Sequence, residues 1–237
     1  MSDRTGPAAP AAPTQRAVLF DTETTGLDPL QGDRVIEVAC IELHRDLPTG
    51  QVFHAFIDPE RDIPAEATRV HGMTRADLRG KPKFAEVAEG LLAFLGDGPL
   101  VAHNAPFDFG FLDAEFARLR RPALDRGRMV DTLAMAKARF PGAPNSLDAL
   151  CRRFGIDLSE RTSHNALLDC QLLAQVYVEL TGGRQRGLTL AADGDGLPGV
   201  SYALARPRTP RLVQPDADAL ARHAAFVAGM KEPVWTR

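Results

Sequence analysis

The sequence has few cysteines, no long apolar run and no excess of positive charge. Its three cysteines are an odd number without CxxC spacing, which predicts reduced, packed thiols suited to the cytoplasm rather than a disulfide framework. No apolar run approaches the roughly 20 residues of a membrane span. The net charge of −3 argues against a protein that holds nucleic acid mainly through a cationic surface. Any bound nucleic acid would be a short segment, with metal ions supplying positive charge.

What is present fits one globular core with an extension, because 44% of the residues are hydrophobic and 25% are charged. Residues 1–15 are rich in Ala and Pro, lack the apolar core of a signal peptide and are predicted to be disordered. Residues 16–183 carry the regular patterns of a folded domain. Residues 184–214 have the Gly, Pro and Arg content of a flexible linker. Residues 215–237 regain helical character but are too few for a core of their own.

Hydrophobic periodicity gives the order of elements within the folded domain. The patterns predict strands at residues 17–23, 34–43, 51–59 and 99–104. They predict helices at residues 84–96, 106–119, 129–140, 145–155 and 162–183, and a further helix in the tail at 216–230. Three early strands followed by helices and one more strand indicate an α/β fold with a mixed sheet flanked by helices.

Four carboxylates stand at positions where a charge is costly. Asp21 and Glu23 end a buried strand and share one face of it, because side chains alternate with a period of two. Asp108 lies at the start of a helix, at the edge of its inward face. Asp169 lies on the apolar stripe of the last long helix, where an unpaired carboxylate would cost several kcal/mol. We expect no lysine or arginine nearby in the sequence to pair with any of the four.

Divalent cations would neutralise such a cluster. Oxygen ligands favour Mg²⁺ or Mn²⁺ over zinc. Two such ions about 4 Å apart form the usual arrangement for hydrolysis of a phosphodiester. His164 precedes Asp169 by five residues and titrates near neutral pH, so it suits a general base that activates water.

Taken singly, most of these residues have an ordinary structural explanation. The strand-end pair of acids could meet an arginine, and Asp108 could be a solvated acid favoured by the helix dipole. His164 could be a surface or capping residue, His103 a satisfied core residue and His71 a turn residue. Asp169 resists such an explanation. The combination of a strand DxE, a helix-start Asp and an HxxxxD helix therefore favours a metal-dependent site.

The three motifs "FDTETTGL" (20–27), "HNAPFD" (103–108) and "HNALLD" (164–169) resemble those of the DEDD 3′–5′ exonucleases, and the histidine of the third marks the DEDDh branch. The resemblance implies a ribonuclease H-like exonuclease fold with a mixed five-stranded sheet, and two Mg²⁺ or Mn²⁺ ions. It implies His164 as general base, Asp21, Glu23, Asp108 and Asp169 as metal ligands, and substrate contacts at Asp21, Glu23, Thr24, Leu27, Glu66, His71, Asn104 and Asp169.

Four further segments, 70–74, 81–88, 139–157 and 161–183, resemble the family of proofreading (epsilon) subunits of bacterial replicative DNA polymerases. That resemblance implies hydrolysis at a single-stranded or frayed 3′ end of DNA, releasing deoxynucleoside 5′-monophosphates. It also implies a cytoplasmic, nucleoid-associated replisome in which the C-terminal tail binds the polymerase (alpha) subunit.

The stretch "QRGLTL" (185–190) follows the predicted nuclease domain. Gln185, Leu188 and Leu190 resemble the polar and apolar anchors of peptides that dock on the bacterial sliding clamp (beta). The alternative is a linker that happens to contain two leucines.

Two other functions stay open from the sequence. The first is a DEDDh exonuclease that trims RNA, of the RNase T or oligoribonuclease type, which the catalytic motifs alone do not exclude. The second is a non-catalytic scaffold between clamp and polymerase. The clamp-like peptide and the tail argue against the first, and the complete set of acids argues against the second.

Overall fold

The computed structural model describes residues 16–161, 163–182 and 214–230. The chain divides into two compact units, the first holding the described residues up to 182 and the second those from 214. The predicted linker, with the clamp-like motif at 185–190, lies almost wholly outside the described residues. No helix in the described segments is long and apolar enough to cross a membrane.

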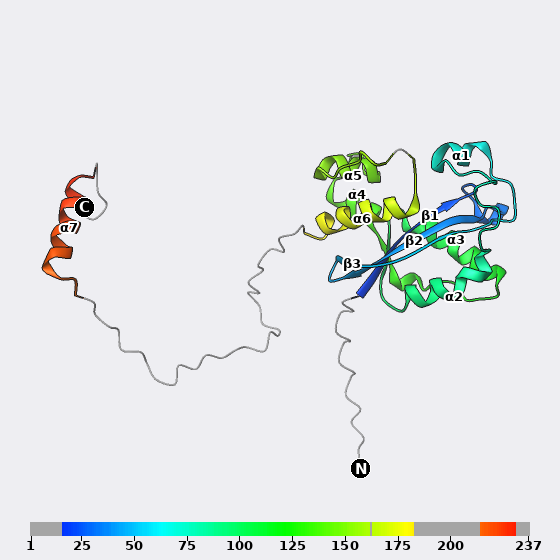
Figure 1. Ribbon diagram of the computed structural model, residues 1–237, viewed down its shortest axis with the longest axis horizontal. Helices are drawn as coiled ribbons and strands as arrows, with labels where there is room; N and C mark the ends of the chain where they lie inside the picture. Colours follow the sequence, from blue (N-terminus) through cyan, green and yellow to red (C-terminus); the bar gives the residue numbers. More distant parts are fainter. Residues whose placement is uncertain (1–15, 162, 183–213, 231–237) are drawn as a thin grey trace, which may run out of the picture. The chain divides into compact units, whose positions relative to one another are not determined.

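A five-stranded sheet forms the centre of the first unit (Figure 1). Its order is β3-β2-β1-β4-β5, where β1 is Arg16–Thr24, β2 Val35–His44, β3 Leu47–Phe56, β4 Leu100–Ala102 and β5 Met129–Asp131. The pairs β1/β2 and β2/β3 are antiparallel, whereas β1/β4 and β4/β5 are parallel. The sequence-based prediction of a mixed five-stranded sheet is confirmed.

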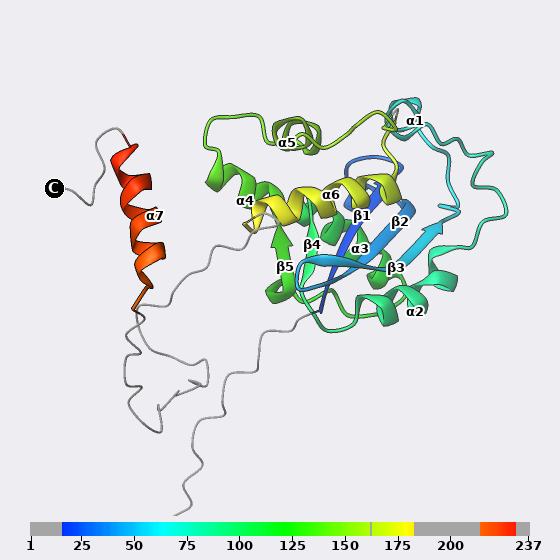
Figure 2. The same cartoon turned by 60° about the vertical axis from the view of Figure 1, so that its left-hand side comes forward.

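The helices cover both faces of this sheet, as Figures 1 and 2 show. One face packs on α2 (Phe84–Leu95) and α3 (Ala105–Arg118), and the other on α4 (Thr132–Arg139), α5 (Leu147–Phe154) and α6 (Ala166–Leu180). Along β1, Val18 and Phe20 belong to the first core and Leu19 to the second. Strand alternation therefore directs Asp21 and Glu23 toward the face that carries α6.

Short elements complete this unit. They are α1 (Ala65–His71) and two 3₁₀ turns, η1 (Pro29–Gln31) and η2 (Arg126–Arg128). A tight turn joins β2 to β3, with positive φ at Arg45 and Asp46, so β3 begins earlier than the predicted residue 51. In the second unit, the helix predicted at 216–230 is present as α7 (Ala217–Ala228), capped by Asp216.

Two predicted helices begin later in the structure than in the sequence analysis. Residues Met129–Asp131 are not helical but form β5, because their backbone groups pair with β4 at the edge of the sheet. Asp131 then caps α4 by accepting a hydrogen bond from the backbone N–H of Leu133 at 3.0 Å. Likewise α6 begins at Ala166 rather than residue 162, because Asn165 takes the extended conformation of a capping residue.

Candidate active site

The four acids singled out in the sequence converge on one cleft. Asp21, Glu23, Asp108 and Asp169, together with His164, line a cavity of about 910 Å³. Glu23, Asp108 and Asp169 are buried, with exposed fractions of 7%, 3% and 3%. Residues from three separate motifs, up to 148 positions apart in sequence, thus form one site.

Local structure explains how each acid reaches the cleft. Asp21 and Glu23 lie at the end of β1, and Asp169 lies in the first turn of α6. Asp108 lies in the first turn of α3. Its Oδ1 accepts hydrogen bonds from the backbone N–H of Thr22 at 3.0 Å and from the Thr22 hydroxyl at 2.7 Å. This contact joins the start of α3 to the strand that carries the DxE pair.

Burial and mutual repulsion make three of the carboxyl groups hard to ionise. Desolvation and the neighbouring charges of Asp108 and Glu23 raise the pKa of Asp21 well above its ordinary value. Desolvation, followed by the charge of Asp169, raises the pKa of Glu23 from 4.5 to about 8. Desolvation raises the pKa of Asp108 to about 7, although the hydrogen bonds from Thr22 oppose it. The site therefore favours a cation.

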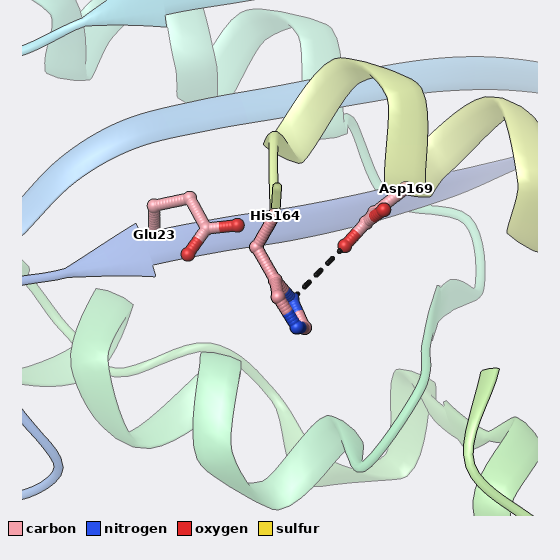
Figure 3. A group of neighbouring side chains, drawn as sticks. All are labelled: Glu23, His164 and Asp169. Carbon is pink, nitrogen blue, oxygen red and sulfur yellow. Dashed lines mark ion pairs between the residues drawn. The ribbon is translucent and has the colours of Figure 1, made fainter. Parts of the chain in front are cut away.

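Three side chains already lie close enough to share a metal ion (Figure 3). Glu23, His164 and Asp169 offer ligand atoms that all lie within 4.8 Å of one another. The Nδ1 atom of His164 lies 3.3 Å from Oδ2 of Asp169. A donor set dominated by carboxylate oxygens, with Asp21 and Asp108 beside it, fits a hard divalent cation.

The expectation that no nearby arginine pairs with these acids was wrong. Arg161 makes a two-pronged contact with Asp169, with Nε–Oδ1 at 2.6 Å and Nη2–Oδ2 at 2.7 Å, and its Nη1 lies 2.7 Å from Oδ1 of Asp148. Burial opposes ionisation of Asp169, but hydrogen bonds from Arg161 and His164 outweigh it and lower the pKa. The loop before α6 turns Arg161 back onto a helix residue eight positions later, which helical periodicity does not reveal.

A second, smaller cavity adjoins the first and shares Glu23 with it. It has a volume of about 280 Å³, and besides Glu23 four more of the predicted substrate residues line it: Thr24, Leu27, Glu66 and His71. Leu27 is 85% exposed. The predicted substrate residue Asn104 lines neither cavity; it precedes α3 in the left-handed conformation, and its backbone N–H donates to Asp131.

The sequence analysis missed two charged residues at this site, Arg161 and Glu37. Glu37 lies near the start of β2, directly opposite Glu23 in the strand register, and it is fully buried. Its only signal in the sequence is an acid inside the apolar segment "RVIEVAC". Its charge contributes to the raised pKa of Glu23, after desolvation and Asp169.

Residues 18–177 match the model of a protein family described as Exonuclease. The chain belongs to this exonuclease family. Within the family it is similar to DNA polymerase III subunit epsilon of several bacteria. It is 41% identical to that of Rickettsia felis over 221 residues, which cover 91% of this chain and 96% of the relative.

Other relatives of this exonuclease carry the same description. It is 43% identical to DNA polymerase III subunit epsilon of Escherichia coli K12 over 187 residues, covering 76% of each chain. It is 38% identical to that of Haemophilus influenzae over 233 residues, covering 92% of this chain and 91% of the relative. The resemblance found in the sequence is therefore confirmed: this exonuclease belongs among the epsilon subunits.

Solved structures support the assignment of the fold. Exonuclease X in complex with 5′ overhanging duplex DNA superposes with a TM-score of 0.56 at 26% identity, covering 70% of this chain and 90% of that one. The zinc-bound complex of E. coli ExoI with single-stranded DNA gives a TM-score of 0.60 at 19% identity, covering 70% of this chain and 40% of that one. The latter likeness concerns the fold alone.

Proposed function

We propose that this chain is a proofreading 3′–5′ exonuclease of bacterial DNA polymerase III. It hydrolyses the terminal phosphodiester of a DNA strand and releases deoxynucleoside 5′-monophosphates. The observation that carries the proposal is the convergence of four acids and His164 in one cleft, in a chain of the epsilon-subunit family. A scaffold without catalysis would gain nothing from buried acids with raised pKa values.

We assign Asp21, Glu23, Asp108 and Asp169 as the residues that hold two Mg²⁺ or Mn²⁺ ions. The raised pKa values fit this assignment, because a cation removes the repulsion that raises them. The guanidinium of Arg161 on Asp169 fits it too, since a positive group already occupies that carboxylate. Bound divalent metal would lower the pKa of the attacking water and neutralise charge on the phosphate.

His164 is the general base in this proposal. For its Nε2 to accept a proton, Nδ1 must carry a hydrogen, which Oδ2 of Asp169 can accept at 3.3 Å. Nη2 of Arg161 lies 3.0 Å from the same Nδ1, and two donors cannot share that contact. Arg161 therefore has to withdraw before His164 can act. The His164 side chain is 49% exposed, so its proton can pass to solvent.

The smaller cavity is suited to the terminal base. Most of its lining surface is apolar, and Leu27 and Val70, which are 85% and 49% exposed, stand at its edge. Such side chains stack on bases without reading their identity. Mispaired ends would be preferred because an unpaired end costs less to melt into the site.

The tail offers a place for a partner within the replisome. Helix α7 exposes Leu220 and Phe226, with exposed fractions of 55% and 64%. We assign this helix to the polymerase (alpha) subunit, and Gln185, Leu188 and Leu190 of the preceding segment to the sliding clamp. A tether of this kind raises the local concentration of the nuclease at the primer end and makes a weak grip on DNA sufficient.

The test uses the purified full chain with Mg²⁺ or Mn²⁺ on 5′-labelled strands. We expect shortening of a DNA primer with a mismatched 3′ end, faster than of a matched primer, and little shortening of RNA. Asp21→Asn should abolish cleavage. Glu89→Gln, which alters an exposed acid of α2 outside the cleft, should cleave like the wild type. Cleavage of RNA alone would favour the RNA-trimming alternative, and cleavage of neither would refute catalysis.

A further inference from the structure

Glu37 is a buried charge without a cationic arginine or lysine partner among the described residues, and it does not line the cleft. Both of its carboxylate oxygens are nevertheless engaged. Oε1 lies 2.7 Å from Nε2 of His54 and accepts a hydrogen bond from Nδ2 of Asn165 at 3.1 Å. Oε2 accepts one from the backbone N–H of Ala166 at 3.3 Å. Like Glu37 itself, its three hydrogen-bond partners do not line the cleft.

These contacts converge on the segment that carries the catalytic histidine. Ala166 is the first residue of α6, Asn165 is its N-cap, and His164 comes immediately before them. The backbone N–H of His164 donates to the carbonyl of Val70 at 3.1 Å. The segment is therefore held from one side by α1 and from the other by Glu37 of β2. A negative charge at this helix start is also favoured by the helix dipole.

Resting on the proposed function, we propose that Glu37 and His54 form a positioning pair that fixes His164 and Asp169 relative to the acids of β1. Glu37 connects the strand beside the DxE pair directly to the start of α6. His54, on edge strand β3, holds Glu37 from the opposite side. Neither residue lines the cleft or the smaller cavity. Displacement of a reacting group by about 1 Å can slow a reaction about a hundredfold, so a fixed helix start has a direct kinetic consequence.

The charge of Glu37 and its hydrogen bonds could act separately, so the test must change one without the other. Asn165→Ser does so. Serine can still accept the capping hydrogen bond that Oδ1 of Asn165 now receives from the backbone N–H of Leu168, but it has no amide to donate to Glu37. The charge of Glu37 stays in place. His54→Ala removes the other side-chain donor, and His54→Gln restores an N–H in a similar position.

We expect Asn165→Ser and His54→Ala to lower kcat on a mismatched DNA primer about tenfold or more. The KM for DNA should stay at the wild-type value, whereas the midpoint of thermal unfolding should fall by a few degrees, because each variant withdraws one donor from a buried carboxylate. His54→Gln should recover most of kcat. Glu42→Gln is the matched control: it removes a carboxylate from the same strand, one that pairs with Arg16 and lies outside the cleft, and it should leave kcat unchanged.

The inference fails if both variants keep the wild-type kcat, or if kcat falls only together with the unfolding midpoint and His54→Gln does not restore it. An NMR measurement without substrate makes the inference independent of activity. Asn165→Ser should speed amide exchange at Ala166 and shift the ring signals of His164, and unchanged spectra would also refute it. A wild-type chain that cleaves no DNA would instead refute the proposed function, while the spectra would still decide the role of Glu37.

Discussion

Removing divalent metal should make the folded chain progressively less stable as the pH rises above about 6.5. Glu23 and Asp21 both contribute to this expectation, and the effect can be sized for Glu23, whose pKa is raised from 4.5 to about 8 in the metal-free fold. Between these values the unfolded chain has released the proton and the folded chain still holds it. Raising the pH therefore favours the unfolded state. A bound cation removes the cause, because it stabilises the ionised carboxylate.

The size of the effect follows from the difference in the number of protons bound by the folded and the unfolded chain. One proton contributes about 1.36 kcal/mol per pH unit, so Glu23 alone lowers the unfolding free energy by about 2 kcal/mol between pH 6.5 and 8. For a domain of this size, that corresponds to a fall of about 4–8 °C in Tm. Asp108, with a pKa raised to about 7, adds to the fall over the first part of the interval.

Between pH 6.5 and 8, other titrating groups do not mask this fall in the unfolding free energy. Burial lowers the pKa of His71 and of His103 below 6.5, so these residues make stability rise with pH, but only below about 6.5. Asp169 has a lowered pKa, so its contribution is lost only at acid pH. Burial raises the pKa of Cys40 above 9.0, outside the interval.

Thermal unfolding of the full chain, followed by circular dichroism at four pH values from 6.5 to 8 in EDTA and in Mn²⁺, measures this slope. Glu23→Gln should make it shallower in EDTA, because one of the groups with a raised pKa no longer titrates. Glu42→Gln, whose carboxylate has a lowered pKa, should keep it. Equal slopes with and without metal, or an unchanged slope in Glu23→Gln, would refute the assignment of these acids as a metal site.

Two further predictions concern residues around the cleft. Arg161→Gln should destabilise the metal-free chain by about 3 kcal/mol in urea unfolding, because it leaves the buried carboxylate of Asp169 unpaired, and Mn²⁺ should reduce that loss. An equal loss with and without Mn²⁺ would contradict it. Gly26→Ala should cost about 1–3 kcal/mol, because an added Cβ would overlap the carboxylate of Asp33, which holds the loop beside the smaller cavity. Wild-type stability of that variant would show that the loop adjusts freely.

Three of the candidate site residues stood out in the sequence because they violate a local rule. Asp169 lies on an apolar helix stripe, and Asp21 and Glu23 follow an apolar strand without interruption. The strands were visible for a different reason: β1 begins as an apolar run, and β2 is long enough to show its alternation. These signals depend on residues close together in the chain.

What the sequence did not reveal depends on contacts between distant residues. Three residues, Met129–Asp131, are too few for a strand pattern, and they form β5 only because β4 offers an unpaired edge. In the sequence Glu37 looks like one acid in an alternating strand. Its proposed role depends on the hydrogen bond that it accepts from Asn165 at the start of α6, 128 residues away. Its pairing with that helix required the tertiary fold.

Arg161 shows how the metal-free fold tolerates its own acids. Its guanidinium neutralises Asp169, contacts Asp148 and lies 3.0 Å from Nδ1 of His164. In the proposed mechanism Nδ1 of His164 donates to Asp169, and the guanidinium of Arg161 competes for that position. Under the proposed function, metal binding would be an exchange, in which an external cation replaces the guanidinium of Arg161 on Asp169 and releases His164. Among the described residues no arginine or lysine forms an ion pair with the acids of β1, and burial followed by neighbouring carboxylates raises their pKa values, whereas hydrogen bonds from Arg161 and His164 lower that of Asp169.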